Sequence, residues 1–239
     1  MTHLNNTLTK TFTSGATAMA ILAGVGMTAA PQAEAAQLTC TASAPCMLSD
    51  FVGTDNFFVT GDKQFADFLY IPTEGNVPTA DNIEVFGEKI GKVINIVFNG
   101  LFLAEEGERA EAFLSHTTTI LKPNTFFKEF DLSFNGQGPF AGITETVFDT
   151  NNPFPVPIAQ LDVDTDNPPS SLFDIVDVSD LKLTSVRAEK DIELFGSGGS
   201  ASISIFRQSY TQDVPEPASM LGLLAVGGLG LVLKRKQAN

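Results

Sequence analysis

Residues 186–210 read VRAEKDIELF, GSGGS and ASISIFRQSY in turn, and this segment decides the fold class. In 186–195 and again in 201–210, apolar side chains alternate with polar ones, which is the period of a strand with one buried face. The five residues between them are small and flexible, and such a run favours a reversal of the chain. We therefore predict two antiparallel strands that pair with each other as a β-hairpin.

The same period recurs through the middle of the chain. Strands are expected at 65–70, after a turn at 61–62, and at 90–98, before a turn at 99–100. Further strands are expected at 126–134, with even-numbered residues on one face, and at 143–148. A short strand at 158–163 is expected between Pro-rich loops at 151–157 and 167–171. Roughly ten short strands with turns every 8–12 residues are typical of two packed antiparallel sheets. The sequence thus predicts one all-β domain, an antiparallel β-sandwich or jelly roll.

The N-terminal segment has the pattern of an export signal. Lys10 is the only charge before an apolar stretch at 16–27, and Ala33 and Ala35 are the small residues that a signal peptidase inspects. We predict a signal peptide at 1–35, with cleavage after Ala35. The β-sandwich domain is then expected at 36–213.

The C-terminal segment, 214–239, has three parts. Pro215, Glu216 and Pro217 hold the chain extended, because each proline fixes its own φ and restricts the residue before it. An uncharged apolar run at 218–233 follows, and we predict it to be a short transmembrane helix. Lys234, Arg235 and Lys236 then act as a membrane stop, which places the basic tail at 234–239 in the cytoplasm.

This tripartite order resembles the PEP-CTERM sorting signal of exported Gram-negative proteins. The resemblance implies that an exosortase, a membrane peptidase, reads the motif around Glu216 and removes the tail. The protein would then be held briefly on the periplasmic side of the inner membrane and end at the cell surface or outside the cell. A permanent single-pass anchor with a Pro-rich stalk is the alternative. Residues 61–65, 143–147, 190–192 and 201–204 also resemble segments of secreted β-sandwich domains that precede such tails, and this likeness implies no active site.

Charge narrows the range of partners. The terminal segments hold two of the chain's 28 acids and four of its 14 bases, so residues 36–213 keep 26 acids and 10 bases, a net charge of −16. Such a surface repels nucleic acid and anionic lipid headgroups and attracts divalent cations. Nucleic acid is therefore excluded as a partner.

Two cysteines, Cys40 and Cys46, lie close together, with Pro45 between them to favour a turn. In an oxidising compartment they are expected to form a local disulfide. His116 is the only histidine outside the signal peptide. A catalytic pair of cysteine and histidine therefore remains an alternative.

Asp162, Asp164 and Asp166 have the alternate spacing with which loop carboxylates converge on Ca²⁺. The EF-hand pattern is incomplete, because Asn167 and Phe173 stand where glycine and a bidentate glutamate belong. A solvated Asp-rich turn is the alternative. A second acidic cluster at 105–111 is expected to be a solvated loop or helical turn.

Function is less visible than the export route. The sequence has no Gly-x-Ser-x-Gly, P-loop or His-Glu-x-x-His motif, so we expect no enzyme. The predicted role is that of a structural or adhesive protein of the surface or extracellular matrix, with exopolysaccharide as a candidate partner. A Ca²⁺-dependent carbohydrate-binding module is the main alternative, although the chain has no Trp and only two Tyr to stack on sugars, and a polysaccharide hydrolase is less favoured.

Overall fold

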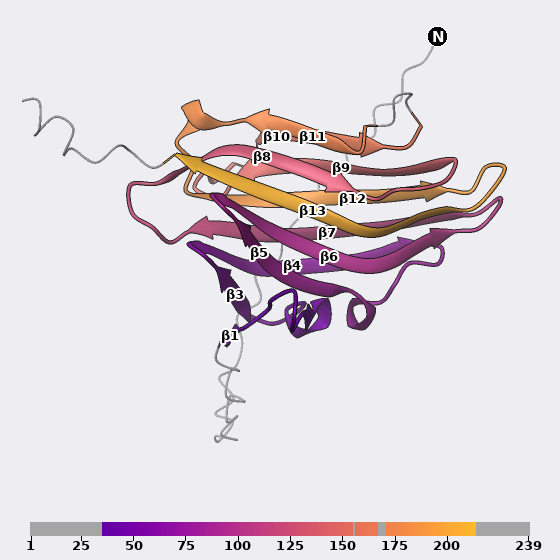
Figure 1. The fold of residues 1–239 in the computed structure, drawn as a ribbon, viewed down its shortest axis with the longest axis horizontal. Coiled ribbons are helices and arrows are strands. Elements are labelled where there is room, and N and C mark those ends of the chain that lie inside the picture. Colours follow the sequence, from indigo (N-terminus) through magenta and orange to yellow (C-terminus); the bar gives the residue numbers. More distant parts are fainter. Residues whose placement is uncertain (1–34, 155, 167–170, 214–239) are drawn as a thin grey trace, which may run out of the picture. The chain divides into compact units, whose positions relative to one another are not determined.

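A computed structural model of the chain describes residues 35–154, 156–166 and 171–213, and these form a two-sheet, all-β structure as the sequence predicted (Figure 1). The strands are β1 (Gln37–Leu38), β2 (Cys46–Met47), β3 (Phe57–Thr60), β4 (Lys63–Glu74), β5 (Glu84–Ile90), β6 (Val93–Ala104), β7 (Arg109–Ile120), β8 (Phe126–Phe134), β9 (Phe140–Asp149), β10 (Pro157–Asp164), β11 (Phe173–Asp177), β12 (Ser185–Phe195) and β13 (Ala201–Asp213). Short 3-10 helices lie at Leu48–Asp50 (η1), Ala80–Asn82 (η2) and Ser179–Leu181 (η3).

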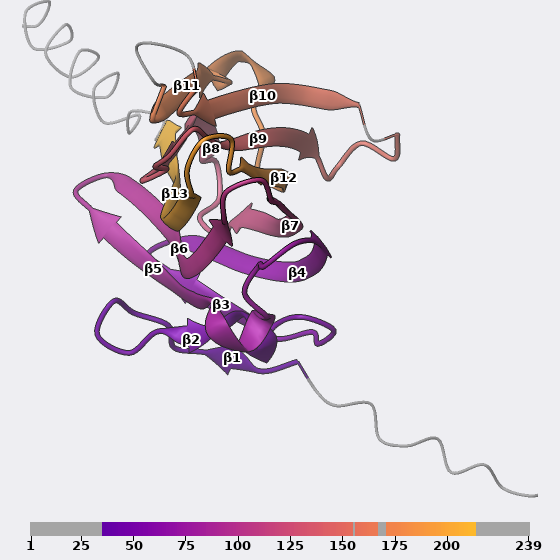
Figure 2. The ribbon, with the colours of Figure 1, turned by 90° about the vertical axis from the view of Figure 1, so that its right-hand side faces the viewer.

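The strands form two sheets that face each other (Figure 2). The seven-stranded sheet has the order β1-β3-β4-β7-β12-β9-β10, and the six-stranded sheet has the order β11-β8-β13-β6-β5-β2. Neighbouring strands are antiparallel, apart from the short parallel pair of β1 and β3. One hydrophobic core contains side chains from both sheets, so each sheet has an inner face and a solvent face.

The predicted hairpin is wrong, although both of its segments are strands. β12 pairs along its whole length with β7 and with β9 in the seven-stranded sheet. β13 pairs instead with β6 and β8 in the six-stranded sheet (Figure 1). Residues 196–200 therefore carry the chain from one sheet to the other. Each of the two strands therefore has a long hydrogen-bonded neighbour on both sides, and neither neighbour is the other strand of the predicted hairpin.

The predicted turn at 99–100 is also wrong. β6 runs through both residues, and the turn lies earlier, at Gly91, whose φ of 62° suits glycine. Gly100 serves packing instead, because a Cβ there would lie 2.9 Å from Cγ1 of Ile83. The turn predicted at 61–62 is present between β3 and β4, with Gly61 at a φ of 61°.

Residues 126–134 form a strand, but their faces are not the predicted ones throughout. Phe127 and Phe130 are both buried, three residues apart. The register slips between Thr211 and Gln212 of β13, which oppose Glu129 and Phe127. A β-bulge therefore shifts the alternation by one residue and brings Phe127 into the core.

Aromatic rings fill the space between the sheets. Tyr210 of β13 lies 5.9 Å from Phe65 of β4 and 5.5 Å from Phe127, measured between ring centroids. Phe98 and Phe206 stack at 4.8 Å within the six-stranded sheet. Complete burial of such a side chain contributes about 1.5–3 kcal/mol relative to leaving it in water. The buried phenylalanines thus help to hold the two sheets together.

A polar network crosses this apolar layer. Lys190 of β12 forms a 2.8 Å ion pair with Glu145 of β9, and both side chains are fully buried. Lys190 Nζ also donates a 2.7 Å hydrogen bond to Oε1 of Gln208 in β13, and Gln208 Nε2 donates to Glu145 Oε1. Burial lowers the pKa of Lys190 and raises the pKa of Glu145, and the attraction between the two groups opposes both shifts.

Removal of one member of this network should be costly. We expect Lys190→Met to lower the free energy of unfolding by about 3–5 kcal/mol, because Glu145 would keep its burial and lose its counter-charge. The double variant Lys190→Met/Glu145→Gln should recover most of the lost stability, since the neutral amide side chain at position 145 can still form a hydrogen bond with Gln208. Urea unfolding at neutral pH measures both effects. Equal stability of Lys190→Met and wild type would show that the ion pair is not important for the fold.

Candidate functional site

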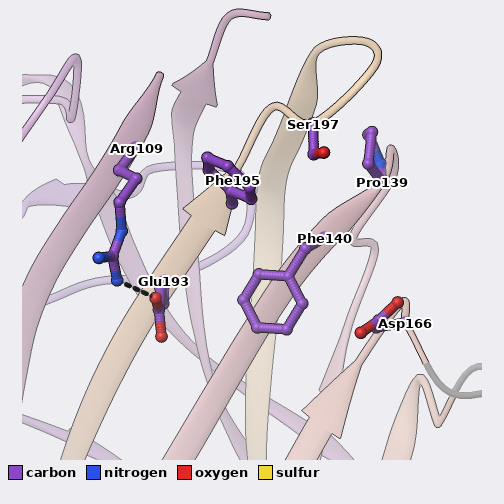
Figure 3. A pocket seen from close by; sticks show the side chains of 7 residues that line it. All are labelled: Arg109, Pro139, Phe140, Asp166, Glu193, Phe195 and Ser197. Atoms are coloured by element: carbon purple, nitrogen blue, oxygen red, sulfur yellow. Dashed lines mark hydrogen bonds and ion pairs between the residues drawn. The ribbon is translucent and has the colours of Figure 1, made fainter. Parts of the chain in front are cut away.

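A hollow of about 600 Å³ opens on the solvent face of the seven-stranded sheet, at one end of its strands. Its walls come from the start of β7, the end of β12 with the following loop, the start of β9 and the residues after β10. The lining side chains are Arg109, Pro139, Phe140, Asp166, Glu193, Phe195 and Ser197 (Figure 3). The strand order explains this gathering, because β7, β12 and β9 are neighbours in the sheet.

Arg109 is oriented by two carboxylates. It donates a hydrogen bond to Glu193 Oε1 and lies 2.7 Å from Glu111 Oε1. The hydrogen bond to Glu193, followed by the charge of Glu111, raises the pKa of Arg109. Partly exposed ion pairs of this kind add little stability. Their effect here is to fix a guanidinium that presents several N–H donors in one plane.

Two phenylalanine rings supply the apolar walls of the hollow (Figure 3). Phe195 is 40% exposed, whereas the preceding Leu194 is completely buried. The ring of Phe140 lies over Gly142, where a Cβ would come within 3.3 Å of its Cζ atom. Gly142 thus leaves room for this ring to lie along the sheet. A surface that combines aromatic rings with oriented donors and carboxylates suits a ligand with an apolar face and hydroxyl groups at its edge.

Of these residues, the sequence singled out Asp166 alone. Phe195 does leave a signal, because the alternation in β12 places odd-numbered residues outward and a phenylalanine is unexpected there, whereas a glutamate at position 193 is ordinary. Arg109 and Phe140 leave no such signal. Their positions depend on which strands pair, and this cannot be inferred from local sequence.

The predicted calcium loop is partly a strand. Asp162 and Asp164 belong to β10, where alternate side chains project from one face about 6.5–7 Å apart along the chain and do not converge. Asp162 Oδ2 accepts from Gln160, and Asp164 Oδ1 accepts from the backbone N–H of Asp166. Among the residues that the structure describes, no group of three or more His, Cys, Asp or Glu side chains could hold a metal ion, and 167–170 lie outside them.

The acidic cluster at 105–111 forms the turn between β6 and β7 and continues into β7, beside the hollow. Glu106 forms a parallel bridge with Gly196, so this turn lies against the loop that joins the two sheets. Gly196 permits the approach, since a Cβ there would meet the carbonyl oxygen of Glu105 at 2.0 Å. We call this end of the sandwich, with Arg109 and the turn 105–108, the acidic end.

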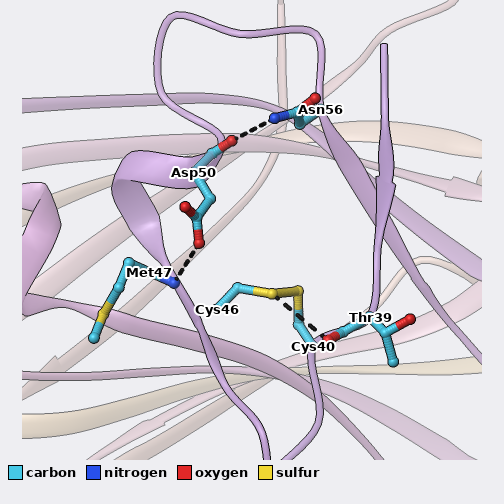
Figure 4. The surroundings of a disulfide bond; sticks show 6 residues. All are labelled: Thr39, Cys40, Cys46, Met47, Asp50 and Asn56. Atoms are coloured by element: carbon cyan, nitrogen blue, oxygen red, sulfur yellow. Dashed lines mark hydrogen bonds between the residues drawn. A yellow bond between two sulfur atoms is a disulfide. The ribbon is translucent and has the colours of Figure 1, made fainter.

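Cys40 and Cys46 form a disulfide, with a Cα–Cα distance of 5.2 Å (Figure 4). Cys46 pairs with Val85 of β5, and the carbonyl of Cys40 accepts from the N–H of Gly87. The disulfide therefore closes a small loop against the edge of the six-stranded sheet. A disulfide-bonded sulfur is not a nucleophile, so neither cysteine forms a catalytic pair with His116.

His116 is a core residue. It is completely buried, and its Nε2 lies 3.0 Å from the hydroxyl of Tyr210, which also accepts a hydrogen bond from Thr118. Burial, together with the nearby charge of Lys190, lowers the pKa of His116 well below its usual value. Because no solvent reaches this ring, it is unsuited to proton exchange with a substrate.

The predicted sorting and export residues fall mostly outside the described residues. These are Ala33, Pro215, Glu216, Pro217, Lys234, Arg235 and Lys236, together with the apolar run 218–233. Ala35 is described and lies exposed just before β1. No helix within 35–154, 156–166 or 171–213 is long and apolar enough to cross a membrane.

Residues 213–236 match the family model of the PEP-CTERM protein-sorting motif. The chain therefore carries this sorting motif, as the sequence predicted, and the motif indicates an exported protein that is processed at a membrane. No curated protein matches the chain.

Several solved structures have a distant likeness to the sandwich. TmCBM61, solved in complex with beta-1,4-galactotriose, is 11% identical with a TM-score of 0.33, over 59% of this chain and 86% of that chain. The enzymatically active domain of tailspike protein 4 from bacteriophage CBA120 is 12% identical with a TM-score of 0.27, over 59% of this chain and 19% of that chain. A carbohydrate-binding module of family 29 is 14% identical with a TM-score of 0.22, over 60% and 90%. TM-scores this low carry no argument about function.

The buried histidine predicts a dependence of stability on pH. Above about pH 6.5, His116 is neutral in both the folded and the unfolded chain. As the pH falls below that value, the unfolded chain binds a proton that the folded chain does not, so stability is lost by up to about 1.4 kcal/mol per pH unit. We expect wild type to lose more stability than His116→Phe or His116→Gln between about pH 7 and 5. If the stability of all three proteins fell equally between about pH 7 and 5, the lowered pKa of His116 would be contradicted.

Proposed function

We propose that this exported chain has a structural or adhesive role at the cell surface or in the extracellular matrix, and that the hollow beside Arg109 binds polysaccharide. The observation that carries the proposal is the arrangement in Figure 3: two phenylalanine rings and an ion-paired arginine share one open hollow. An open hollow suits a polymer chain, which must enter and leave along its length.

The chemistry of the hollow matches a sugar. The apolar C–H face of a sugar ring can pack on Phe140 or Phe195, while its hydroxyl groups accept from Arg109 and donate to Glu193 and Asp166. A domain with a net charge of −16 would repel an acidic polymer. We therefore propose a neutral polysaccharide as the ligand.

Two other functions are separated from this one by their chemistry. A Ca²⁺-dependent binder would use Asp166 at the rim of the hollow, together with ligands other than Asp162 and Asp164 of β10. A hydrolase would need two carboxyl groups in separate acid and base or nucleophile roles, and Glu193 is engaged by Arg109. We propose that the domain binds polysaccharide without metal and without cleaving it.

The aromatic walls provide the test of binding. The double variant Phe140→Ala/Phe195→Ala should lose at least about tenfold in retention on extracellular polysaccharide, because truncation of central aromatic contacts typically removes more than 1.4 kcal/mol. Affinity electrophoresis through gels that contain the polysaccharide measures this retention. Phe173→Ala is the matched control, since Phe173 is 53% exposed on β11 of the other sheet and should have no effect.

Further conditions distinguish the alternatives. Retention should persist in a chelator, and incubation with the polysaccharide should liberate no reducing ends. Release by chelator would replace the proposal with calcium-dependent binding, and new reducing ends would replace it with hydrolysis. Unchanged retention of the double phenylalanine variant would show that the hollow is not the binding site.

A change in the sorting motif should block removal of the C-terminal tail. We propose that an exosortase-type peptidase recognises Glu216 between its two prolines, after signal peptidase has cut behind Ala35 and while 218–233 hold the chain in the inner membrane. Glu216→Ala should leave export intact and block removal of the tail, which the intact mass of the exported protein reports. Asp55→Ala, the loss of one exposed carboxylate outside the matched motif, should be processed as wild type. Normal processing of Glu216→Ala would exclude this recognition.

A further inference from the structure

The strand ends opposite the acidic end carry a concentration of lysines. A second hollow, of about 550 Å³, lies there and is lined by Lys89, Lys92 and Lys122 together with Asp62 and Asp213. Lys89 lies near the end of β5, Lys92 lies in the turn between β5 and β6, and Lys122 lies in the loop after β7; all three are exposed. We call this region the lysine end.

The lysines are close enough to act together. Lys63, buried at the first position of β4, is ion-paired to Asp62 at 2.8 Å. Burial is the main cause that lowers the pKa of Lys63, and the charges of Lys122 and Lys89 lower it further against the opposing effect of Asp62. Three lysines and two aspartates line this hollow, so its lining has a net charge of +1 on a chain whose net charge is −14.

Exposed apolar side chains stand beside these lysines. Ile90 is 56% exposed between Lys89 and the β5–β6 turn, and Leu121 is 50% exposed next to Lys122. Leu181, 49% exposed, precedes Lys182, whose Nζ lies 5.9 Å from the ring of Phe126, the register partner of Asp213. Side chains that pair an apolar group with a lysine are suited to the boundary between water and lipid headgroups.

The place where the chain leaves the domain indicates that the lysine end faces the membrane. Asp213 ends β13 and lines the lysine hollow, and only residues 214–217 separate it from the apolar run at 218. Five residue steps span at most about 18 Å. The twelve residues of β7, which lead from the acidic end toward the lysine end, span about 40 Å. A chain held in a bilayer by 218–233 is therefore tethered at its lysine end.

We propose that the lysine end docks on the anionic headgroup surface of the bilayer while the tail holds the chain there. This proposal rests on the transient membrane anchoring put forward above. The lysines supply the charge complementarity, and Ile90, Leu121 and Leu181 enter the headgroup layer. Docking orients the sandwich so that the hollow beside Arg109 points away from the membrane.

The test uses the full chain reconstituted in vesicles of phosphatidylglycerol mixed with phosphatidylcholine, and in vesicles of phosphatidylcholine alone. Resistance to alkaline carbonate extraction reports insertion of the tail. Hydrogen exchange of the amides at 89–92 and of Leu121, Lys122 and Asn124 reports docking, with the acidic turn 105–108 as an internal reference. We expect the amides of the lysine end to exchange more slowly on the vesicles that contain phosphatidylglycerol than on phosphatidylcholine vesicles. The amides of the acidic turn should exchange at the same rate on both.

Matched variants separate local charge from net charge. Lys89→Gln/Lys92→Gln/Lys122→Gln should insert normally but lose docking by about fivefold per lysine, or roughly a hundredfold together. Glu105→Gln/Glu106→Gln/Glu108→Gln raises the net charge by three at the far end, whereas the lysine variant lowers it by three. It should dock as wild type, and tighter docking would show that net charge controls the binding. An inserted wild-type chain without protection at the lysine end would overturn docking and leave anchoring intact. A chain that carbonate extracts would overturn anchoring, and docking with it.

Discussion

The sandwich depends on one register of its paired strands and one alignment of its two sheets. The buried contact of Lys190, Glu145 and Gln208 selects this arrangement over others. The three groups come from β12, β9 and β13, so they tie both sheets at one point. A slip of any of these strands by one residue would turn its polar group toward solvent and an outward side chain into the core. Hydrophobic burial drives the sheets together, but apolar side chains tolerate many arrangements. The polar contact tolerates few, because each unpaired member would be left buried.

The strands could be predicted from the sequence because alternation is local, whereas their pairing could not. The polar members of the core even show in the alternation: Lys190, Glu145 and Gln208 each occupy a position whose neighbours at two residues' distance are buried. The flexible segment 196–200 suits a hairpin and a crossing between sheets equally well, so the choice is made by distant strands. The hollow at the acidic end was missed for the same reason. Its residues lie on strands that become neighbours only in the folded sheet, and the carboxylates that the sequence singled out in β10 are held extended.

Net charge is a similar case of a property that the fold redistributes. A sum of −16 over the domain suggests a uniformly acidic surface. The strands instead sort the charges lengthwise: β6 and β7 meet at a turn rich in glutamate, while the opposite strand ends gather lysines around Asp213. The two ends thus differ in charge: lysines gather at the end where β13 stops and the sorting motif begins, and the aromatic hollow lies at the end with the glutamate-rich turn.

The central position of β13 also orders the events of secretion. On the proposed export route, the chain crosses the membrane from its N-terminus, so residues 201–213 are among the last of the domain to emerge. Yet β13 lies between β8 and β6, and without it the six-stranded sheet is two separate pieces. The domain is therefore unable to close while its final strand is still in transit. Since the sorting motif begins at residue 213, where this strand ends, completion of the fold coincides with the arrival of the motif at the membrane. The proposed export route therefore places translocation, closure of the sandwich and exposure of the motif one after another along a single stretch of chain.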